Sequence, residues 1–179
     1  EVRVLAISEG GIAGELHYPR AREHWPFSPS RLGTALPSTY SWGNTLKFGK
    51  EDRIEPYLQD GWAPPSTGFT WSTGNRASLQ LQAKPPAVPV LLETFFKPFL
   101  APGQLDLQRI QVYLSGQPVG EWQASKNGFQ IYRLEIEAVS FPKSGPFTLE
   151  FRTPDSAAPS ALGAGADRRV LGIAMVWVR

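Results

Sequence analysis

The stretch Phe147-Thr-Leu-Glu-Phe-Arg152 alternates apolar and polar residues without a break. A period of two puts the apolar side chains on one face of a β-strand and the polar ones on the other. A helix would instead need apolar residues every three or four positions. The stretch therefore predicts a strand with one face on a hydrophobic core and one face in water, as in an antiparallel sheet.

The same alternation recurs elsewhere in the chain. Apolar residues occupy every second position in residues 76–82, 110–114 and 132–137. Residues 90–96 and 170–178 are apolar on both faces, which predicts central strands.

Two tryptophans and one turn fit this strand pattern. Leu114-Ser-Gly-Gln-Pro-Val119 predicts a hairpin turn, in which Gly116 can adopt a positive φ. Trp122 and Trp177 lie within strand patterns, so both are expected in the core.

Composition supports a turn-rich fold. Glycine and proline number 17 each among 179 residues and show no period. One helical turn is indicated at Pro159-Ser-Ala-Leu-Gly163, with proline in the first turn and glycine just past the end. The predicted fold is all-β: an antiparallel, jelly-roll-like β-sandwich of roughly eight strands with at most one short helical turn.

The first residues differ from the rest. Val2, Val4 and Ala6 fit the start of a strand, but His24-Trp-Pro-Phe-Ser-Pro29 is typical of extended coil. We expect residues 1–32 to be an irregular arm or linker and residues 33–179 to form one β-sandwich domain. Because the chain begins at Glu1 without Met, we interpret it as a piece of a longer protein.

Several functional classes lack support. The net charge is +2 and no run of Lys or Arg exceeds two, so nucleic acid is not a predicted partner. No apolar run approaches the roughly 20 residues that span a bilayer. The sequence has no cysteine, no Gly-x-Ser-x-Gly elbow and no nucleotide-binding glycine loop, so no cofactor is predicted.

A metal site is not predicted either. The two histidines, His17 and His24, lie seven apart in the irregular arm. Structural calcium is harder to exclude, but none of its candidate ligands lies in a calcium-loop pattern. Those candidates are Glu51, Asp52, Asp155 and Asp167.

Four carboxylates cluster before residue 61: Glu51, Asp52, Glu55 and Asp60. A glycosidase pair flanks the scissile bond and usually comes from different strands. We therefore interpret this cluster as a solvated turn and predict no catalytic residue.

The candidate binding site lies in and before the loop Asp60–Gly74, where Trp62 and Trp71 flank a segment rich in proline and glycine. Sugar rings stack on flat aromatic faces, and nearby polar groups can accept bonds from sugar hydroxyls. The same tryptophans could instead plug one end of the sandwich. The predicted ligand-binding residues are Trp62, Trp71, Tyr57, Asp60, Glu55 and Gln59.

The order of motifs resembles an accessory β-domain that is fused to bacterial glycosyltransferases and to phosphoglycerol transferases acting on periplasmic glucans. The resemblance covers roughly residues 33–179. It rests on residues 57–62, Pro65, residues 71–74, 99–103, 112–117, 120–122, 149–151, Pro154-Asp155, Pro159, Leu162-Gly163, residues 167–169 and Leu171-Gly172. Two positions depart from the family pattern: Ser66 replaces a Glu after Pro65, and Gly68-Phe69 replaces a Trp-Gly pair.

The resemblance implies a non-catalytic module tethered to a catalytic domain, associated with the cell envelope, with the periplasm slightly favoured over the cytoplasm. The leading hypothesis is a carbohydrate-binding or substrate-positioning module of a bacterial envelope or exopolysaccharide glycosyltransferase system, with a poly- or oligosaccharide as partner. The second is a structural domain that docks catalytic domains, in which Asp155, Asp167 and Arg169 form ion pairs that fix the loop before the last strand. The third, least favoured, is a glycan-cleaving enzyme.

Overall fold

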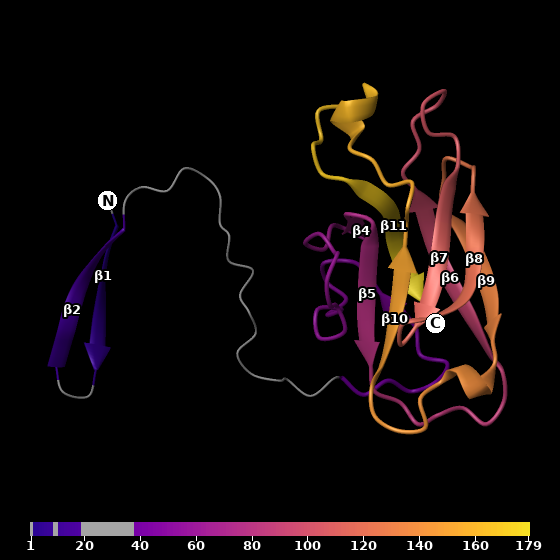
Figure 1. Cartoon of the computed structure of the whole chain (residues 1–179), viewed down its shortest axis with the longest axis horizontal. Coiled ribbons are helices and arrows are strands. Elements are labelled where there is room, and N and C mark those ends of the chain that lie inside the picture. The colour runs from indigo at the N-terminus through magenta and orange to yellow at the C-terminus, as the bar shows by residue number, and fades with distance from the viewer. Residues whose placement is uncertain (1, 9–10, 19–37) are drawn as a thin grey trace. The chain divides into compact units, whose positions relative to one another are not determined.

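The computed structural model describes residues 2–8, 11–18 and 38–179 (Figure 1). The chain divides into two compact units, Glu1–Ala35 and Leu36–Arg179. In the first unit, strands β1 (Val2–Ser8) and β2 (Gly11–Tyr18) pair in antiparallel fashion, with a register shift between Ala6 and Ile7. An irregular arm was expected over residues 1–32; the described part of that range forms a strand pair, and residues 19–32 lie outside the described residues. The strand signal at Val2, Val4 and Ala6 is the part of the sequence that fits this pair.

The second unit is an antiparallel β-sandwich of nine strands, as predicted, with most successive strands alternating between two sheets (Figure 1). One sheet has the order β5-β10-β7-β8; the other has the order β3-β11-β6-β9, with β4 also paired to β11. The strands are β3 (Leu46–Lys47), β4 (Thr70–Thr73), β5 (Arg76–Leu81), β6 (Val90–Pro98), β7 (Gln108–Leu114), β8 (Gln117–Ala124), β9 (Gln130–Ile136), β10 (Phe147–Arg152) and β11 (Leu171–Val178).

The core lies between the two sheets and follows from the period-two alternation. Phe151 and Ile110 of the four-stranded sheet and Phe96, Ile173 and Met175 of the five-stranded sheet have no exposed surface. Each such side chain contributes roughly 1.5–3 kcal/mol when it is fully buried. The inward residues of both sheets therefore supply most of the driving force for folding.

Helical structure is limited to short 3₁₀ turns in the described residues. Pro159–Leu162 forms the predicted turn, and Gly163 ends it with a φ of 65°. The structure also contains a second turn, Ala138–Ser140, where only one turn was expected. The sequence of this second turn contains no proline or glycine that would have indicated it. Within the described part of the chain, no helix combines the length and apolarity that crossing a membrane requires.

Strands β6 and β11 are central, as their apolar sequences predicted. Their outer faces, however, are not fully covered: Leu91 on β6 is 53% exposed. Trp177 on β11 was expected in the core, and this prediction is wrong, because its side chain lies on the outer face opposite Phe95 and is only partly buried. A register shift between Met175 and Trp177 moves the end of β11 out of simple alternation. The apolar residues on the second face of β6 and β11 therefore form part of the outer surface of the five-stranded sheet and not a second buried layer.

Candidate functional site

The two tryptophans of the predicted loop lie in different environments. Trp62 packs against the core, with its ring centroid 5.0 Å from that of buried Phe48. Its Nε1 donates a 2.8 Å hydrogen bond to the carbonyl oxygen of Ser78. The polar end of this indole is thus already bonded within the protein.

The residues predicted beside Trp62 run along the edge of the four-stranded sheet. Leu58 bridges to Leu79 of β5, which places residues 57–60 next to that strand. Tyr57 donates its hydroxyl to the Thr39 carbonyl at 3.1 Å. The polar side chains nearby are exposed: Gln59 Nε2 lies 3.4 Å from Gln80 Oε1, Asp60 lies 3.9 Å from Arg76, and Glu55 is also exposed.

Trp71 belongs to the other sheet. It lies on β4 opposite Ala174 of β11, between the buried neighbours Thr70 and Ser72, so its ring is on the outer face of the five-stranded sheet. The backbone of Trp62 bridges to Ser72 beside Trp71, but the Trp71 ring lies on the outer face of the five-stranded sheet, whereas residues 57–60 lie along β5 of the other sheet.

On that outer face, five aromatic rings follow one another. We call this surface the aromatic face; its rings are those of Trp71, Phe69, Phe129, Phe95 and Trp177. Successive ring centroids lie 6.3, 6.0, 5.6 and 5.8 Å apart along that order. Phe129 is 39% exposed, and the neighbouring Ile131 on β9 is 47% exposed. The other four rings are only partly exposed. Apolar side chains that gather on one surface and remain partly exposed are typical of an interaction site.

Cationic groups are interleaved with the rings. Lys97 on β6 holds its Nζ 5.1 Å from the ring centroid of Phe129 and 5.6 Å from those of Phe69 and Trp71. The guanidinium carbon of Arg179 lies 5.5 Å from the centroid of Trp177. These are distances at which a cation is attracted by a ring face.

One carboxylate lies among these cations. Glu93 on β6 accepts a 2.6 Å hydrogen bond from Nε of Arg133 and another from Nε of Arg179. The hydrogen bonds from Arg179 and then Arg133 lower the pKa of Glu93. Its oxygens are therefore occupied by two guanidinium groups.

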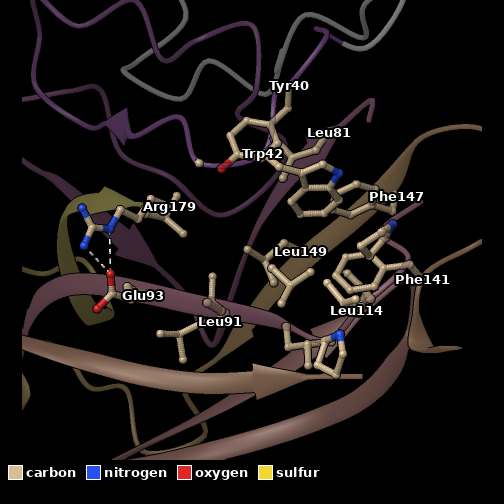
Figure 2. A pocket seen from close by; sticks show the side chains of 18 of the residues that line it. Tyr40, Trp42, Leu81, Leu91, Glu93, Leu114, Phe141, Phe147, Leu149 and Arg179 are labelled. Carbon is tan, nitrogen blue, oxygen red and sulfur yellow. Dashed lines mark hydrogen bonds and ion pairs between the residues drawn. The ribbon is translucent and has the colours of Figure 1, made fainter. Parts of the chain in front are cut away.

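An apolar pocket of about 660 Å³ lies at the end of the sandwich where β5, β7 and β11 finish, and its lining includes Leu91, Glu93 and Arg179 (Figure 2). Trp42 stacks parallel to Phe147 at its edge, with centroids 6.0 Å apart, and Phe141 packs edge-on at 5.3 Å. The Nε1 of Trp42 donates to the Lys84 carbonyl at 2.8 Å, and the hydroxyl of Tyr40 donates to the Asn44 carbonyl at 2.8 Å. These two polar groups are bonded within the protein, so the polar lining left for sugar hydroxyls is the Glu93–Arg179 ion pair.

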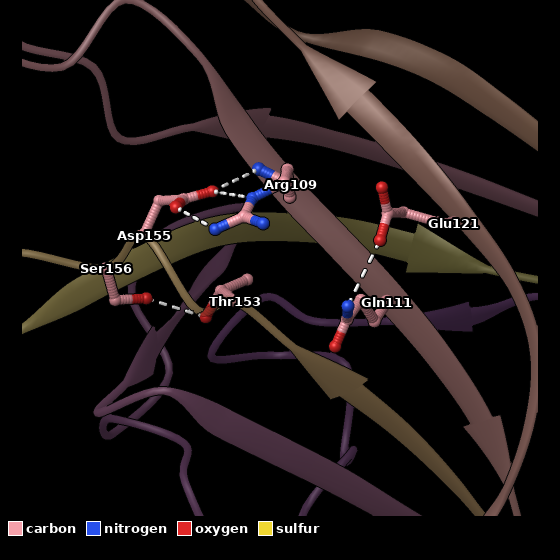
Figure 3. A network of polar contacts seen from close by, with 6 residues as sticks. All are labelled: Arg109, Gln111, Glu121, Thr153, Asp155 and Ser156. Carbon is pink, nitrogen blue, oxygen red and sulfur yellow. Dashed lines mark hydrogen bonds and ion pairs between the residues drawn. The ribbon is translucent and has the colours of Figure 1, made fainter.

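Asp155 and Asp167 pair with two different arginines: Asp167 with Arg169, and Asp155 with Arg109, which was not among the predicted residues. Asp155 accepts bonds from Nε, Nη2 and the backbone N–H of Arg109, at 2.9, 2.7 and 3.0 Å (Figure 3). Asp167 pairs with Arg169, with an Nη2 to Oδ2 distance of 2.6 Å. Hydrogen bonds from the arginines lower both pKa values, that of Asp167 to about 2.

These pairs hold the loop before β11. Arg109 lies at the start of β7, so its bond to Asp155 ties that loop to the four-stranded sheet. Asp167 and Arg169 brace the loop locally, two residues apart.

The calcium candidates do not converge. Among the described residues, no three His, Cys, Asp or Glu side chains are grouped so as to hold a metal ion. Asp52 instead accepts a bond from the Gly49 amide at 2.9 Å.

No model of a known protein family matches the chain, and no curated protein matches its sequence. Among solved structures, the carbohydrate-binding module CBM36 in complex with calcium and xylotriose is 10% identical, with 69% of this chain and 87% of that chain covered and a TM-score of 0.41. The CBM36-1 domain of a multidomain xylanase from the hindgut metagenome of Trinervitermes trinervoides is 10% identical, with 76% and 95% covered and a TM-score of 0.43. The C-terminal CBM6 of a marine laminarinase from Zobellia galactanivorans is 15% identical, with 75% and 97% covered and a TM-score of 0.41. At these low identities and TM-scores, the activities in those names are not carried over to this chain.

Proposed function

We propose that this chain is a non-catalytic carbohydrate-binding module that holds a poly- or oligosaccharide on the aromatic face. The observation that carries the proposal is the run of five neighbouring rings from Trp71 to Trp177 on one uncovered side of the five-stranded sheet. Strand positions fix most of these rings, so little conformational entropy is lost when a ligand binds.

The chemistry of the face suits a sugar. The C–H side of a pyranose ring is apolar and can lie on an aromatic ring, while its hydroxyls need polar partners at the edge. Arg133 and Arg179 flank the rings, with side chains 59% and 52% exposed. A face with apolar rings in the middle and hydrogen-bond donors at its rim meets both needs.

The order of motifs along residues 33–179 supports a cellular context for this binding. We propose that the module belongs to a bacterial envelope or exopolysaccharide glycosyltransferase system and is tethered to a catalytic domain. Tethering would raise the effective concentration of glycan near the catalytic domain, so even weak binding would be useful. The proposed location is the cell envelope, with the periplasm favoured.

A docking function is the second candidate. Leu91 and Ile131 are aliphatic, exposed and close to the aromatic face, and aliphatic side chains pack against protein more readily than against sugar. A glycan-cleaving enzyme has less support. General acids in such enzymes have raised pKa values, whereas the displaced carboxyl pKa values in the described residues, those of Glu93, Asp155 and Asp167, are all lowered.

The test is binding of the full chain to a panel of soluble polysaccharides by affinity electrophoresis, followed by titration calorimetry with oligosaccharides of the best binder. We expect Trp71→Ala to lower affinity at least about tenfold, or about 1.4 kcal/mol. Trp62 and Asp60 lie outside the aromatic face. The variants Trp62→Phe and Asp60→Asn should therefore bind the polysaccharide with unchanged affinity. If the chain binds no polysaccharide of the panel, the proposed function is contradicted. If Asp60→Asn lowers the affinity, the binding site lies in the loop beside β5 and not on the aromatic face.

A further inference from the structure

We propose that the aromatic face selects acidic glycans, chains whose sugars carry carboxylate or sulfate groups; this inference rests on the proposed function. The outer face of the five-stranded sheet joins stacked rings to an excess of positive charge, and Lys97 provides the central contact for the anion.

Lys97 occupies the middle of the rings. Its Nζ lies 5.1–5.6 Å from the centroids of Phe69, Trp71 and Phe129, which belong to three different parts of the chain. Among the described residues, no carboxylate lies within 4.0 Å of this ammonium group. Ring faces stabilise the cation but do not neutralise it, so a full positive charge is available to a ligand lying on the rings.

The surrounding charges have the same sign. Lys47 on β3 is exposed and lies directly opposite Trp177, so it shares the outer face. Arg133 and Arg179 also lie there, and both bond to the single carboxylate of Glu93.

One more acidic residue belongs to this face. Glu135 is exposed on β9, two positions beyond Arg133 and opposite Leu91. It therefore lies toward the end of β6 remote from Lys97. Asp52 lies beside Gly68, the residue before Phe69, where it accepts the Gly49 amide. On β6, β9 and β11 themselves, cationic side chains near the rings still outnumber carboxylates.

An anionic sugar fits this arrangement better than a neutral one. A neutral ring placed over Lys97 replaces water at the ammonium group only with neutral hydroxyl acceptors, which is close to an even exchange. A carboxylate or sulfate on the ring would instead form a charge-assisted hydrogen bond with it while the ring stacks beside it. Lys47, Arg133 and Arg179 would add weaker, salt-sensitive attraction along the chain of the glycan.

The experiment compares four probes on the full chain by calorimetry: polygalacturonate oligomers, dextran sulfate, neutral β-glucan oligomers and single-stranded DNA. We expect at least one acidic glycan to bind at least about tenfold more tightly than the neutral one. Raising the salt concentration from 50 to 300 mM should weaken acidic binding severalfold and leave neutral binding unchanged. The two acidic probes separate a preference for carboxylate from one for sulfate.

Lys97→Gln should lower acidic-glycan affinity at least about tenfold and change neutral-glycan affinity less than twofold, with thermal unfolding as the folding check. Lys47→Gln, at the rim, should lower acidic affinity about two- to threefold. Lys143→Gln, an exposed lysine in the loop before β10, is the matched control and should have no effect.

The outcomes separate the two proposals. Equal affinity for neutral and acidic glycans, with loss on Trp71→Ala, would overturn the acidic preference and keep the carbohydrate-binding function. Binding of no glycan would overturn both. Tighter binding of single-stranded DNA than of any glycan would also overturn both, since stacked bases and phosphates suit the same pairing of rings and cations.

Discussion

The indole Nε1 of Trp62 donates a 2.8 Å hydrogen bond to the carbonyl oxygen of Ser78, and its ring packs on Phe48. Trp62→Phe keeps an aromatic ring but removes one of the two donors to that carbonyl, which also accepts the backbone N–H of Gln59 at 3.0 Å. We expect the free energy of unfolding to fall by about 1 kcal/mol, the net value of one hydrogen bond, measured by urea denaturation.

The same variant also separates a structural role from a binding role. Affinity for the best glycan should stay within twofold of the parent chain, because Trp62 lies outside the aromatic face. Unchanged stability together with a large loss of affinity would show that Trp62 contacts the ligand.

Two glycines of the tryptophan loop have nearly equal φ but different surroundings. Gly61 has a φ of 82° and Gly74 a φ of 78°. A Cβ on Gly61 would collide with the backbone carbonyl of Arg76, whereas a Cβ on Gly74 would meet no atom within 4 Å. Gly74→Ala should cost about 1 kcal/mol of unfolding free energy for the left-handed conformation alone. Gly61→Ala should cost at least about 2 kcal/mol more, because backbone must move.

Both values come from chemical denaturation of the two variants in parallel. Equal losses for Gly61→Ala and Gly74→Ala would mean that the Arg76 carbonyl adjusts freely. The contact of Gly61 with β5 would then not hold the loop in place.

The sandwich was predictable because apolar and polar residues alternate with a period of two along most of its strands. Phe147–Arg152 became β10 with Phe147, Leu149 and Phe151 buried, as the alternation required. The extra 3₁₀ turn at Ala138–Ser140 was not predictable in this way, because a single turn needs no periodic pattern.

The candidate site was predictable only in part. Trp71 was singled out because it lies in an unusual loop, but Phe69, Phe95, Phe129 and Lys97 come together through pairing of β4, β11, β6 and β9. Strand register across a sheet is a long-range property that neighbouring residues do not encode. The available signal was the pair of apolar outer residues Leu91 and Phe95, which were interpreted as deeply buried because each strand was considered singly.

The pairing of Asp167 with Arg169 predicts an unusual titration. Nε and Nη2 of Arg169 bond to the carboxylate, and the pKa of Asp167 falls from 3.8 to about 2. Because the folded pKa lies below the unfolded one, the pair stabilises the fold above about pH 4 and loses this contribution as the pH falls to about 2. Arg169→Gln should return the Asp167 pKa toward 3.8, as measured by carboxyl ¹³C NMR.

Asp155 is the internal control for that experiment. Its pKa is lowered by hydrogen bonds from Arg109, so Arg169→Gln should leave it unchanged. A parallel rise at Asp155 would mean that the substitution loosens the whole loop before β11. An Asp167 pKa that stays near 2 in the variant would assign its lowering to groups other than the Arg169 side chain, such as the backbone N–H of residue 169.

The last prediction concerns Trp42, because a substitution there tests the end pocket and leaves the rings of the aromatic face in place. Its ring stacks on Phe147 at 6.0 Å and packs against Phe141 at 5.3 Å, while 38% of the residue is exposed. Trp42→Ala removes these contacts and the bond to the Lys84 carbonyl, so we expect a loss of about 2–3 kcal/mol in the free energy of unfolding. Glycan affinity of the folded variant should stay within twofold, as measured by calorimetry. A tenfold loss of affinity with unchanged stability would instead place the glycan in this pocket.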